Sequence, residues 1–267
     1  MNLLFVFVAL VLPICGSVSP FASLHSPTSA QAKMPPAYDE PPVLDLGDGT
    51  TLDVFHGTTT LAFVYSGGII AAVDSRASLG KLVGSRTTDK VLPVSKHILG
   101  TMAGGAADCS YWIRALSTRV RQWELTEGAP CSATVAAHTL VNMVRQNRGL
   151  SVGTMIMGAD NTGQPCIYYI DDSGVCVRGD IFSVGSGSNY AISVLDGETR
   201  RSKLSQEEAI ELAVRAIQRA THRDAFSGGY INVYHISPTE GWHQISRIDS
   251  AQLEEPFTQK KSGGDQL

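Results

Sequence analysis

Three consecutive threonines, Thr58 to Thr60, follow Gly57 where a proline- and serine-rich leader gives way to alternating apolar segments. Cleavage between Gly57 and Thr58 would leave Thr58 with a free α-amine beside its own hydroxyl, so one residue would carry both a nucleophile and a base. Because threonine favours β structure, the same triplet is also typical of an ordinary edge strand. The triplet alone favours the strand, and the choice depends on residues further along the chain.

A threonine hydroxyl is a weak nucleophile, and an α-amine with a pKa of about 7.7–8.0 can act as its base near neutral pH. A nearby cation would keep that amine neutral, and a buried cation needs a carboxylate partner. Asp74 ends the second expected strand and Lys90 opens the third, so both can return to the Thr58 end of the sheet. Each alone is typical of a surface charge, but the ordered set of Thr58, Asp74 and Lys90 favours a catalytic site.

Acyl transfer also needs hydrogen-bond donors for the developing oxyanion. Gly104 and Gly105 lie between an expected strand and an expected helix, where backbone N–H groups are free and approachable, although a plain turn has the same pattern. Three more polar residues lie at the ends of expected elements: Ser186, Asp224 and Ser227. They could order the amine and hydroxyl of Thr58 or merely cap turns, and spacing does not decide between these two roles.

Hydrophobic periodicity predicts the elements that would position these residues. Expected strands cover residues 58–65, 68–74, 91–94, 98–102, 152–157, 166–169, 175–177, 230–236 and 242–248. Expected helices cover 106–127, 189–195 and 205–221, and another runs from the cap Ser132 to a stop at Gly149. The helices have one apolar face each, so two helical pairs and two antiparallel sheets predict a layered α+β sandwich.

The composition indicates three regions in the 267 residues. Residues 1–57 are expected to form a leader or propeptide with a hairpin near Asp48-Gly49, because 16–57 hold six of the twelve prolines. Residues 58–250 form the expected catalytic domain, and 251–267 form a flexible tail. The net charge of −4 is scattered along the chain, which predicts no nucleic-acid partner and no stable membrane association.

Residues 3–12 form an apolar run like the middle of a signal peptide, but no lysine or arginine precedes it. A targeting segment, a disposable leader and a mispredicted first exon remain alternatives. The four cysteines after the leader lack Cys-x-x-Cys spacing, so we expect no metal site and reduced thiols. The state of Cys166 and Cys176, which flank an expected hairpin turn, stays open.

Five segments, in order along the chain, resemble the proteasome beta subunits, and most of all their catalytic chymotrypsin-like type, type five. They are GTTTLAF at 57–63, AVDSRAS at 72–78, GTMAGGAADC at 100–109, SVGSGS at 183–188 and DAFSGG at 224–229. The resemblance covers roughly residues 55–248. It implies an N-terminal-nucleophile hydrolase fold, a four-layer αββα sandwich.

The resemblance also implies roles for individual residues. Thr58 would be nucleophile and, through its amine, base, after self-cleavage at Gly57-Thr58. Asp74 and Lys90 would be the charge pair and Gly104 the oxyanion donor, while three residues would support Thr58: Ser186, Asp224 and Ser227. The substrate pocket would be lined by Ala77, Ser78, Thr88, Met102, Ala103 and Ala106. Ser78 departs from the threonine expected there, and residues 80–84 are unlike the family.

These roles imply a threonine endopeptidase of the 20S proteasome that cuts unfolded polypeptides after bulky hydrophobic residues, because small alanine walls and Met102 leave room for a large apolar side chain. No metal or organic cofactor is expected. The expected partners are other beta subunits in a heptameric ring and an alpha ring. The expected location is the cytoplasm and nucleus, or another compartment if residues 1–17 are a targeting segment. The alternatives are a non-catalytic structural ring subunit and a stand-alone N-terminal-nucleophile amidohydrolase.

Overall fold

The computed structural model describes residues 43–45, 51–53, 57–79, 82–147 and 149–253. Contacts divide the chain into Met1–Pro36 and Ala37–Leu267, and the elements below belong to the second unit. Within the predicted leader, β1 (Val43–Asp45) pairs antiparallel with β2 (Thr51–Asp53), as expected around Asp48-Gly49, although the turn itself lies outside the described residues. The apolar run at 3–12 and the tail beyond residue 253 also lie outside them, so the predicted domain boundaries stay predictions.

A five-stranded antiparallel sheet carries the threonine triplet at the start of one of its inner strands. Its order is β13 (Ile181–Val184), β3 (Thr60–Tyr65), β4 (Gly68–Val73), β14 (Tyr230–Ser237) and β15 (Gly241–Asp249). Helices α3 (Ser188–Asp196) and α4 (Gln206–Arg223) bury their apolar sides on one face of this sheet. The predicted capping box begins α4, with Ser205 and Glu208 each satisfying a backbone N–H of the other.

A second sheet has the order β12 (Cys176–Gly179), β11 (Pro165–Asp171), β10 (Val152–Ala159), β8 (Ile98–Thr101) and β7 (Val91–Ser95), and β9 (Ala103–Gly104) also pairs with β10. Helices α1 (Ala106–Glu127) and α2 (Ala133–Arg145) cover its outer face. A separate hairpin joins β5 (Ala77–Leu79) to β6 (Leu82–Ser85). Short 3₁₀ turns occupy Arg201–Lys203 and Ser250–Gln252.

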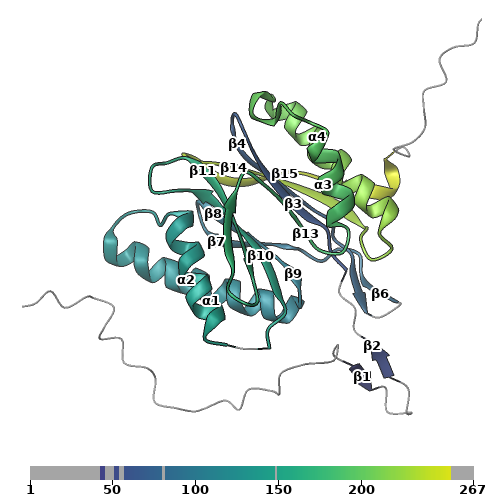
Figure 1. Ribbon diagram of the computed structural model, residues 1–267, viewed down its shortest axis with the longest axis horizontal. Helices are drawn as coiled ribbons and strands as arrows, with labels where there is room; N and C mark the ends of the chain where they lie inside the picture. Colours follow the sequence, from purple (N-terminus) through teal and green to yellow (C-terminus); the bar gives the residue numbers. More distant parts are fainter. Residues whose placement is uncertain (1–42, 46–50, 54–56, 80–81, 148, 254–267) are drawn as a thin grey trace, which may run out of the picture. The chain divides into compact units, whose positions relative to one another are not determined.

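The inner faces of the two sheets meet in an apolar core of their own, which includes Ala71, Leu99, Met155 and Ile236. Two further cores lie beneath the helices on the outer faces. Figure 1 shows α1 and α2 beside β7, β8 and β10, and α3 and α4 beside β3 and β13. The predicted four-layer αββα sandwich is therefore confirmed.

Several elements differ from the predictions. Strands β5, β6, β9 and β13 were not expected, because they are short and show no clear alternation of apolar residues. Helix α2 ends at Arg145 and does not reach Gly149, because the side-chain amide of Asn147 donates to the carbonyl of Met143 at 2.8 Å and closes the last turn.

The four described cysteines are free thiols, of which Cys176 is half-buried and the other three are buried. The register of β10, β11 and β12 places Cys176 opposite Ile170 and Cys166 opposite Gly158. The two cysteines on either side of the turn are therefore not cross-strand partners, which answers the question that the sequence left open.

Candidate active site

Thr58 lies two residues before β3, and its side chain is buried. Its hydroxyl Oγ1 donates to the carbonyl oxygen of Gly57 at 2.7 Å, and its backbone nitrogen donates to Ser186 Oγ at 3.2 Å. The predicted nucleophile therefore contacts the peptide bond whose cleavage would free its amine. A Cβ added to Gly57 would lie 1.8 Å from the Cβ of Phe226, so the close approach of these segments requires glycine at that position.

Lys90 and Asp74 form a buried ion pair beside this peptide bond. The Nζ of Lys90 lies 2.6 Å from Oδ1 of Asp74, and the two side chains are 2% and 0% exposed. The same Nζ donates to the carbonyl oxygen of Gly57 at 3.2 Å. Asp74 follows the end of β4 and Lys90 precedes the start of β7. These two strand ends thus bring a cation to the carbonyl that Thr58 Oγ1 also contacts.

Backbone donors complete the environment of the Asp74 carboxylate. The N–H groups of Thr59, Gly228 and Arg76 donate to its two oxygens at 2.9, 2.9 and 3.2 Å. Burial lowers the pKa of Lys90 below 10.5, and the negative charge of Asp74 opposes that shift. The pair places the Lys90 ammonium, with its charge balanced by Asp74, next to the Gly57 carbonyl.

A second polar network supports Thr58 from the other side. Ser186 Oγ accepts from the Thr58 nitrogen and lies 2.6 Å from Oδ2 of Asp224, to which it donates. Ser227 Oγ donates to the same Oδ2 at 2.6 Å and lies 2.7 Å from the hydroxyl of Thr59. Asp224 thus orders the hydroxyls of Ser186 and Ser227, which contact the Thr58–Thr59 segment.

The edge strand β13 is the element that brings Ser186 to Thr58. Its residues pair with β3 from Val184↔Thr60 to Ile181↔Phe63, and the chain then turns at Gly185. Gly185 has φ +110°, and a Cβ there would lie 2.0 Å from the carbonyl oxygen of Thr58. Glycine is therefore required both by the left-handed backbone and by the close approach of the two segments.

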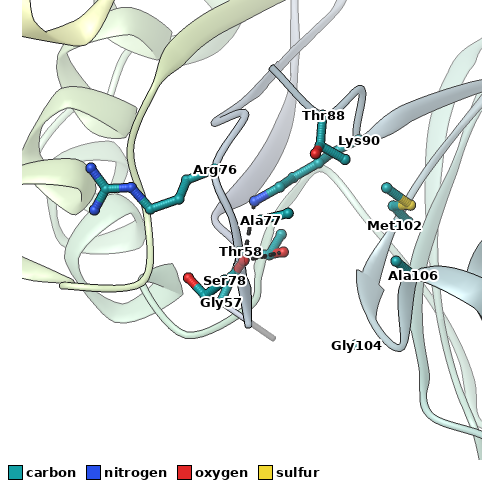
Figure 2. Close-up of a pocket in the computed structure, with 10 residues that line it drawn as sticks. All are labelled: Gly57, Thr58, Arg76, Ala77, Ser78, Thr88, Lys90, Met102, Gly104 and Ala106. Atoms are coloured by element: carbon teal, nitrogen blue, oxygen red, sulfur yellow. Dashed lines mark hydrogen bonds between the residues drawn. The ribbon is translucent and has the colours of Figure 1, made fainter. Parts of the chain in front are cut away.

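A pocket adjoins Thr58, and Figure 2 shows the side chains that line it. Met102, between β8 and β9, and Ala106, at the start of α1, lie across from Gly57 and Thr58 in this view. The predicted pocket residues Ala77, Ser78 and Thr88 also line it. So does Gly104, the predicted oxyanion donor, which has φ +98° and lies so close to Ser151 that a Cβ would meet its carbonyl oxygen at 2.8 Å.

One predicted pocket residue, Ala103, does not line this pocket, although Met102 and Gly104 on either side of it do. Successive residues of an extended segment point to opposite sides, and Ala103 is buried where β9 pairs with β10. The family resemblance named Ala103 because it falls at one of the family's substrate-pocket positions, and its role there stays a prediction.

Two residues of the site were not predicted. Thr59 joins the Ser227 hydroxyl to the triplet, and Arg76 lines the pocket and donates from its guanidinium to the carbonyl of Ala225 at 2.9 Å. Arg76 lies two residues after Asp74 in the AVDSRAS segment. This closeness to a predicted catalytic residue is the sequence signal that could have identified Arg76 as part of the site. The structure brings the predicted catalytic residues into one hydrogen-bonded region, and their catalytic roles stay predictions: Thr58, Asp74, Lys90, Ser186, Asp224 and Ser227.

The described residues contain no group of three or more histidine, cysteine, aspartate or glutamate side chains arranged to hold a metal ion. Among the helices described for this chain, none is both long and apolar enough to cross a membrane.

Comparison with known proteins finds a family model, described as "Proteasome subunit", that matches residues 54–236. The chain is 49% identical over 211 residues to proteasome subunit beta type-5 of Gallus gallus, covering 78% of this chain and 81% of the relative. It is 50% identical over 208 residues to the beta type-5 subunit of Dictyostelium discoideum, covering 77% and 75%. It is 45% identical over 212 residues to proteasome subunit beta type-8 of Homo sapiens, covering 78% and 76%.

Proposed function

The chain belongs to the proteasome subunit family, and from that premise we propose that it is a threonine endopeptidase subunit of the 20S proteasome core. It cleaves unfolded polypeptides after bulky hydrophobic residues. The observation that carries the proposal is the contact of both Thr58 Oγ1 and Lys90 Nζ with the carbonyl oxygen of Gly57. A nucleophile and a cation at the bond that would release an N-terminal threonine have no role in a purely structural ring subunit.

The first reaction of such a chain is its own cleavage. Thr58 Oγ1 forms a bond to the Gly57 carbonyl carbon, the bond from that carbon to the Thr58 nitrogen breaks, and the hydroxyl proton ends on the released amine. Water then hydrolyses the resulting ester, which leaves a carboxylate on Gly57 and a free hydroxyl on Thr58. The Lys90 ammonium donates to the Gly57 oxygen and so stabilises the negative charge that develops there.

The freed amine then serves as the base for external substrates. It takes the Thr58 hydroxyl proton as Oγ1 attacks the scissile carbonyl carbon, and it passes that proton to the departing amine. Water hydrolyses the acyl ester on Thr58 and restores the free residue. We assign Gly104 as the N–H donor for the oxyanion, in keeping with its position in the lining of the pocket.

The pocket accounts for the preference for large apolar side chains. Its apolar surface comes from Ala77, Met102 and Ala106. Of the two cations in its lining, Lys90 is paired with Asp74, and Arg76 donates to the carbonyl of Ala225. A bulky apolar side chain buries its surface against alanine and methionine.

The test is the N-terminal sequence and intact mass of this chain in the purified native particle. We expect it to begin at Thr58, and a Thr58→Ala variant to keep residues upstream of Gly57. A mature chain that begins upstream of Gly57 would leave no free amine on Thr58 and would rule out the proposed mechanism. The chain would then be a structural subunit.

We further propose that the chain assembles with six other beta-type subunits in a ring, against an alpha ring, and that it acts in the cytoplasm and nucleus. Family membership supports assembly with other proteasome subunits. The composition of the ring and the location in the cell are our proposals. Affinity purification through a C-terminal tag is expected to recover both classes of subunit. Recovery of the chain alone would favour the stand-alone amidohydrolase, and fluorescence of the same tag in an organelle would favour a targeting segment.

A further inference from the structure

The pocket next to Thr58 contains one polar side chain whose role is not explained by the reaction. Thr88 precedes Lys90 by two residues, lines the pocket and is half-buried. Its backbone nitrogen donates to the carbonyl of Ser75 at 3.0 Å. Within the described part of the chain, its hydroxyl has no hydrogen-bond partner.

The other polar side chains of the pocket differ from Thr88 in this respect. The hydroxyl of Thr58 donates to Gly57, and the hydroxyl of Ser78 lies 3.5 Å from the carbonyl oxygen of Phe226. Lys90 is paired with Asp74, and Arg76 donates to the carbonyl of Ala225, although its Nε has no hydrogen-bond partner among the described residues. Among the side-chain hydroxyls of the lining, that of Thr88 is thus the one without a hydrogen-bond partner in the described part of the chain.

The position of Thr88 relative to the nucleophile decides which substrate atom can reach it. Figure 2 shows Thr88 at the opposite end of the drawn residues from Gly57, with its hydroxyl oxygen directed toward the other lining residues. Ala77 and Met102 line the same pocket, and in this view Lys90 lies between Thr58 and Thr88. A long aromatic side chain therefore presents its tip, and not its stem, to this hydroxyl.

We propose that Thr88 is a specificity-determining residue that favours cleavage after tyrosine over cleavage after phenylalanine. The inference rests on the proposed function and names a substrate class within it. A tyrosine hydroxyl can both donate to and accept from the Thr88 hydroxyl, whereas a phenylalanine ring removes water from that hydroxyl without replacing the hydrogen bond. At this half-buried position, one neutral hydrogen bond made to tyrosine but not to phenylalanine corresponds to about a fivefold difference in kcat/KM between the two substrates.

The test uses the assembled native particle carrying wild-type chain, Thr88→Val, Thr88→Ser or the neighbouring Thr87→Val. Valine has nearly the shape of threonine but no hydroxyl, serine keeps the hydroxyl, and Thr87 is exposed and does not line the pocket. Two fluorogenic peptides that differ only in tyrosine or phenylalanine at the cleaved residue give a ratio of kcat/KM values. That ratio is insensitive to the amount of active particle.

We expect Thr88→Val to lower the tyrosine-to-phenylalanine ratio about fivefold, and Thr88→Ser and Thr87→Val to leave it near the wild-type value. An unchanged ratio in Thr88→Val, or an equal fall in Thr87→Val, would overturn the inference. If Thr88→Val does not assemble, the wild-type particle decides with a third peptide that carries 4-methylphenylalanine. Tyrosine preferred over this isostere supports the inference, and equal cleavage of the two overturns it.

The outcome also separates this inference from the proposed function. A wild-type particle that cleaves both peptides with equal kcat/KM refutes the role of Thr88 alone. Two other results together would refute the proposed function, and the inference with it. The mature wild-type chain would start upstream of Gly57, and the particle carrying Thr58→Ala would keep its activity on both peptides.

Discussion

At the scale of single residues, the site depends on charges that are buried and yet fully partnered. Asp74 receives one ammonium and three backbone donors, so no part of its charge is left without a partner. Lys90 in turn divides its donors between Asp74 and the carbonyl oxygen of Gly57. Such a pair contributes little net stability while both members are present, but the loss of one leaves the other charged in an apolar site.

The first prediction follows from that asymmetry. Asp74→Ala leaves the buried Lys90 ammonium without a counter-charge and three backbone N–H groups without their acceptor, and we expect it to destabilise the chain by about 3–5 kcal/mol. It should also prevent cleavage at Gly57-Thr58, since the cation at the Gly57 carbonyl is no longer held in place. The melting temperature of the purified particle and the intact mass of the chain measure both effects.

Arg178→Ala is the control, because it breaks the exposed ion pair of Arg178 with Asp160. We expect it to leave both the melting temperature and the mass nearly unchanged. A loss of processing in Arg178→Ala equal to that in Asp74→Ala would show that the burial of the Lys90–Asp74 pair is not what matters.

The second prediction concerns the pH dependence of kcat/KM in the processed particle. Activity should rise with pH as the Thr58 amine, with an ordinary pKa of about 7.7–8.0, loses its proton and becomes a base. Activity should fall again when Lys90 becomes neutral, because its cation is lost above its pKa. Burial lowers that pKa, so the alkaline fall should begin below pH 10.5.

Initial rates from pH 6 to pH 10.5, with a return to pH 8 to confirm that the particle is intact, give this profile. Activity that stays level up to pH 10.5 would show that the charge on Lys90 is not required for peptide hydrolysis.

At the scale of elements, the active site is assembled where strand ends and loops meet. Asp74 follows β4, Lys90 precedes β7, and Ser186 follows the edge strand β13. The ladder between β13 and β3 determines how near Ser186 lies to the Thr58 nitrogen, a residue 128 positions away in the chain. A change in the turn after β13 should therefore act on Thr58 even though the turn contains no reacting group.

The third prediction tests this with Gly185→Ala. The new Cβ would lie 2.0 Å from the Thr58 carbonyl oxygen, so Ser186 must move and cleavage at Gly57-Thr58 should slow at least tenfold, an effect of about 1.4 kcal/mol. Gly163→Ala is the matched control, because Gly163 also has a positive φ, +80°, but has no atom within 4 Å of the added Cβ.

The rate of appearance of the chain beginning at Thr58, followed by mass spectrometry after a pulse of synthesis, separates the two variants. We expect Gly163→Ala to process at nearly the wild-type rate despite its backbone strain. Similar slowing in both would mean that positive φ alone, and not contact with Thr58, accounts for the effect.

At the scale of the whole molecule, the described residues form four apolar clusters: one between the sheets, one beneath α3 and α4, one beneath α1 and α2, and a small one around Met102, Cys109 and Val152. Cys131 and Cys166 lie in the cluster beneath α1 and α2, and Cys176 packs against it. Burial raises the pKa of Cys109, Cys131 and Cys166 to about 11. The thiolate is the reactive form of cysteine, and at pH 8 these groups are almost entirely protonated. Their reactivity should therefore report the integrity of the fold.

The fourth prediction is that iodoacetamide at pH 8 modifies Cys176 first in the folded protein, because that residue alone of the four is half-buried. Modification of Cys109, Cys131 and Cys166 should be at least tenfold slower, and all should react together in denaturant. Peptide mapping after timed quenching gives the rates. Rapid alkylation of Cys109 in the active particle would show that the core beneath α1 opens far more often than its burial implies.

The sequence by itself determined the elements with strong periodicity and clear caps, such as α1 and the capping box of α4, because these depend on neighbours within a few positions. It also determined the family and the order of Thr58, Asp74 and Lys90. Only the tertiary structure decided that β13 exists and lies beside β3, that Thr59 contacts Ser227, and that Met102 and Gly104 line the pocket while Ala103 between them does not. These features depend on pairing between strands more than a hundred residues apart, or on which side of a short strand a residue faces, and neither is encoded in local propensity.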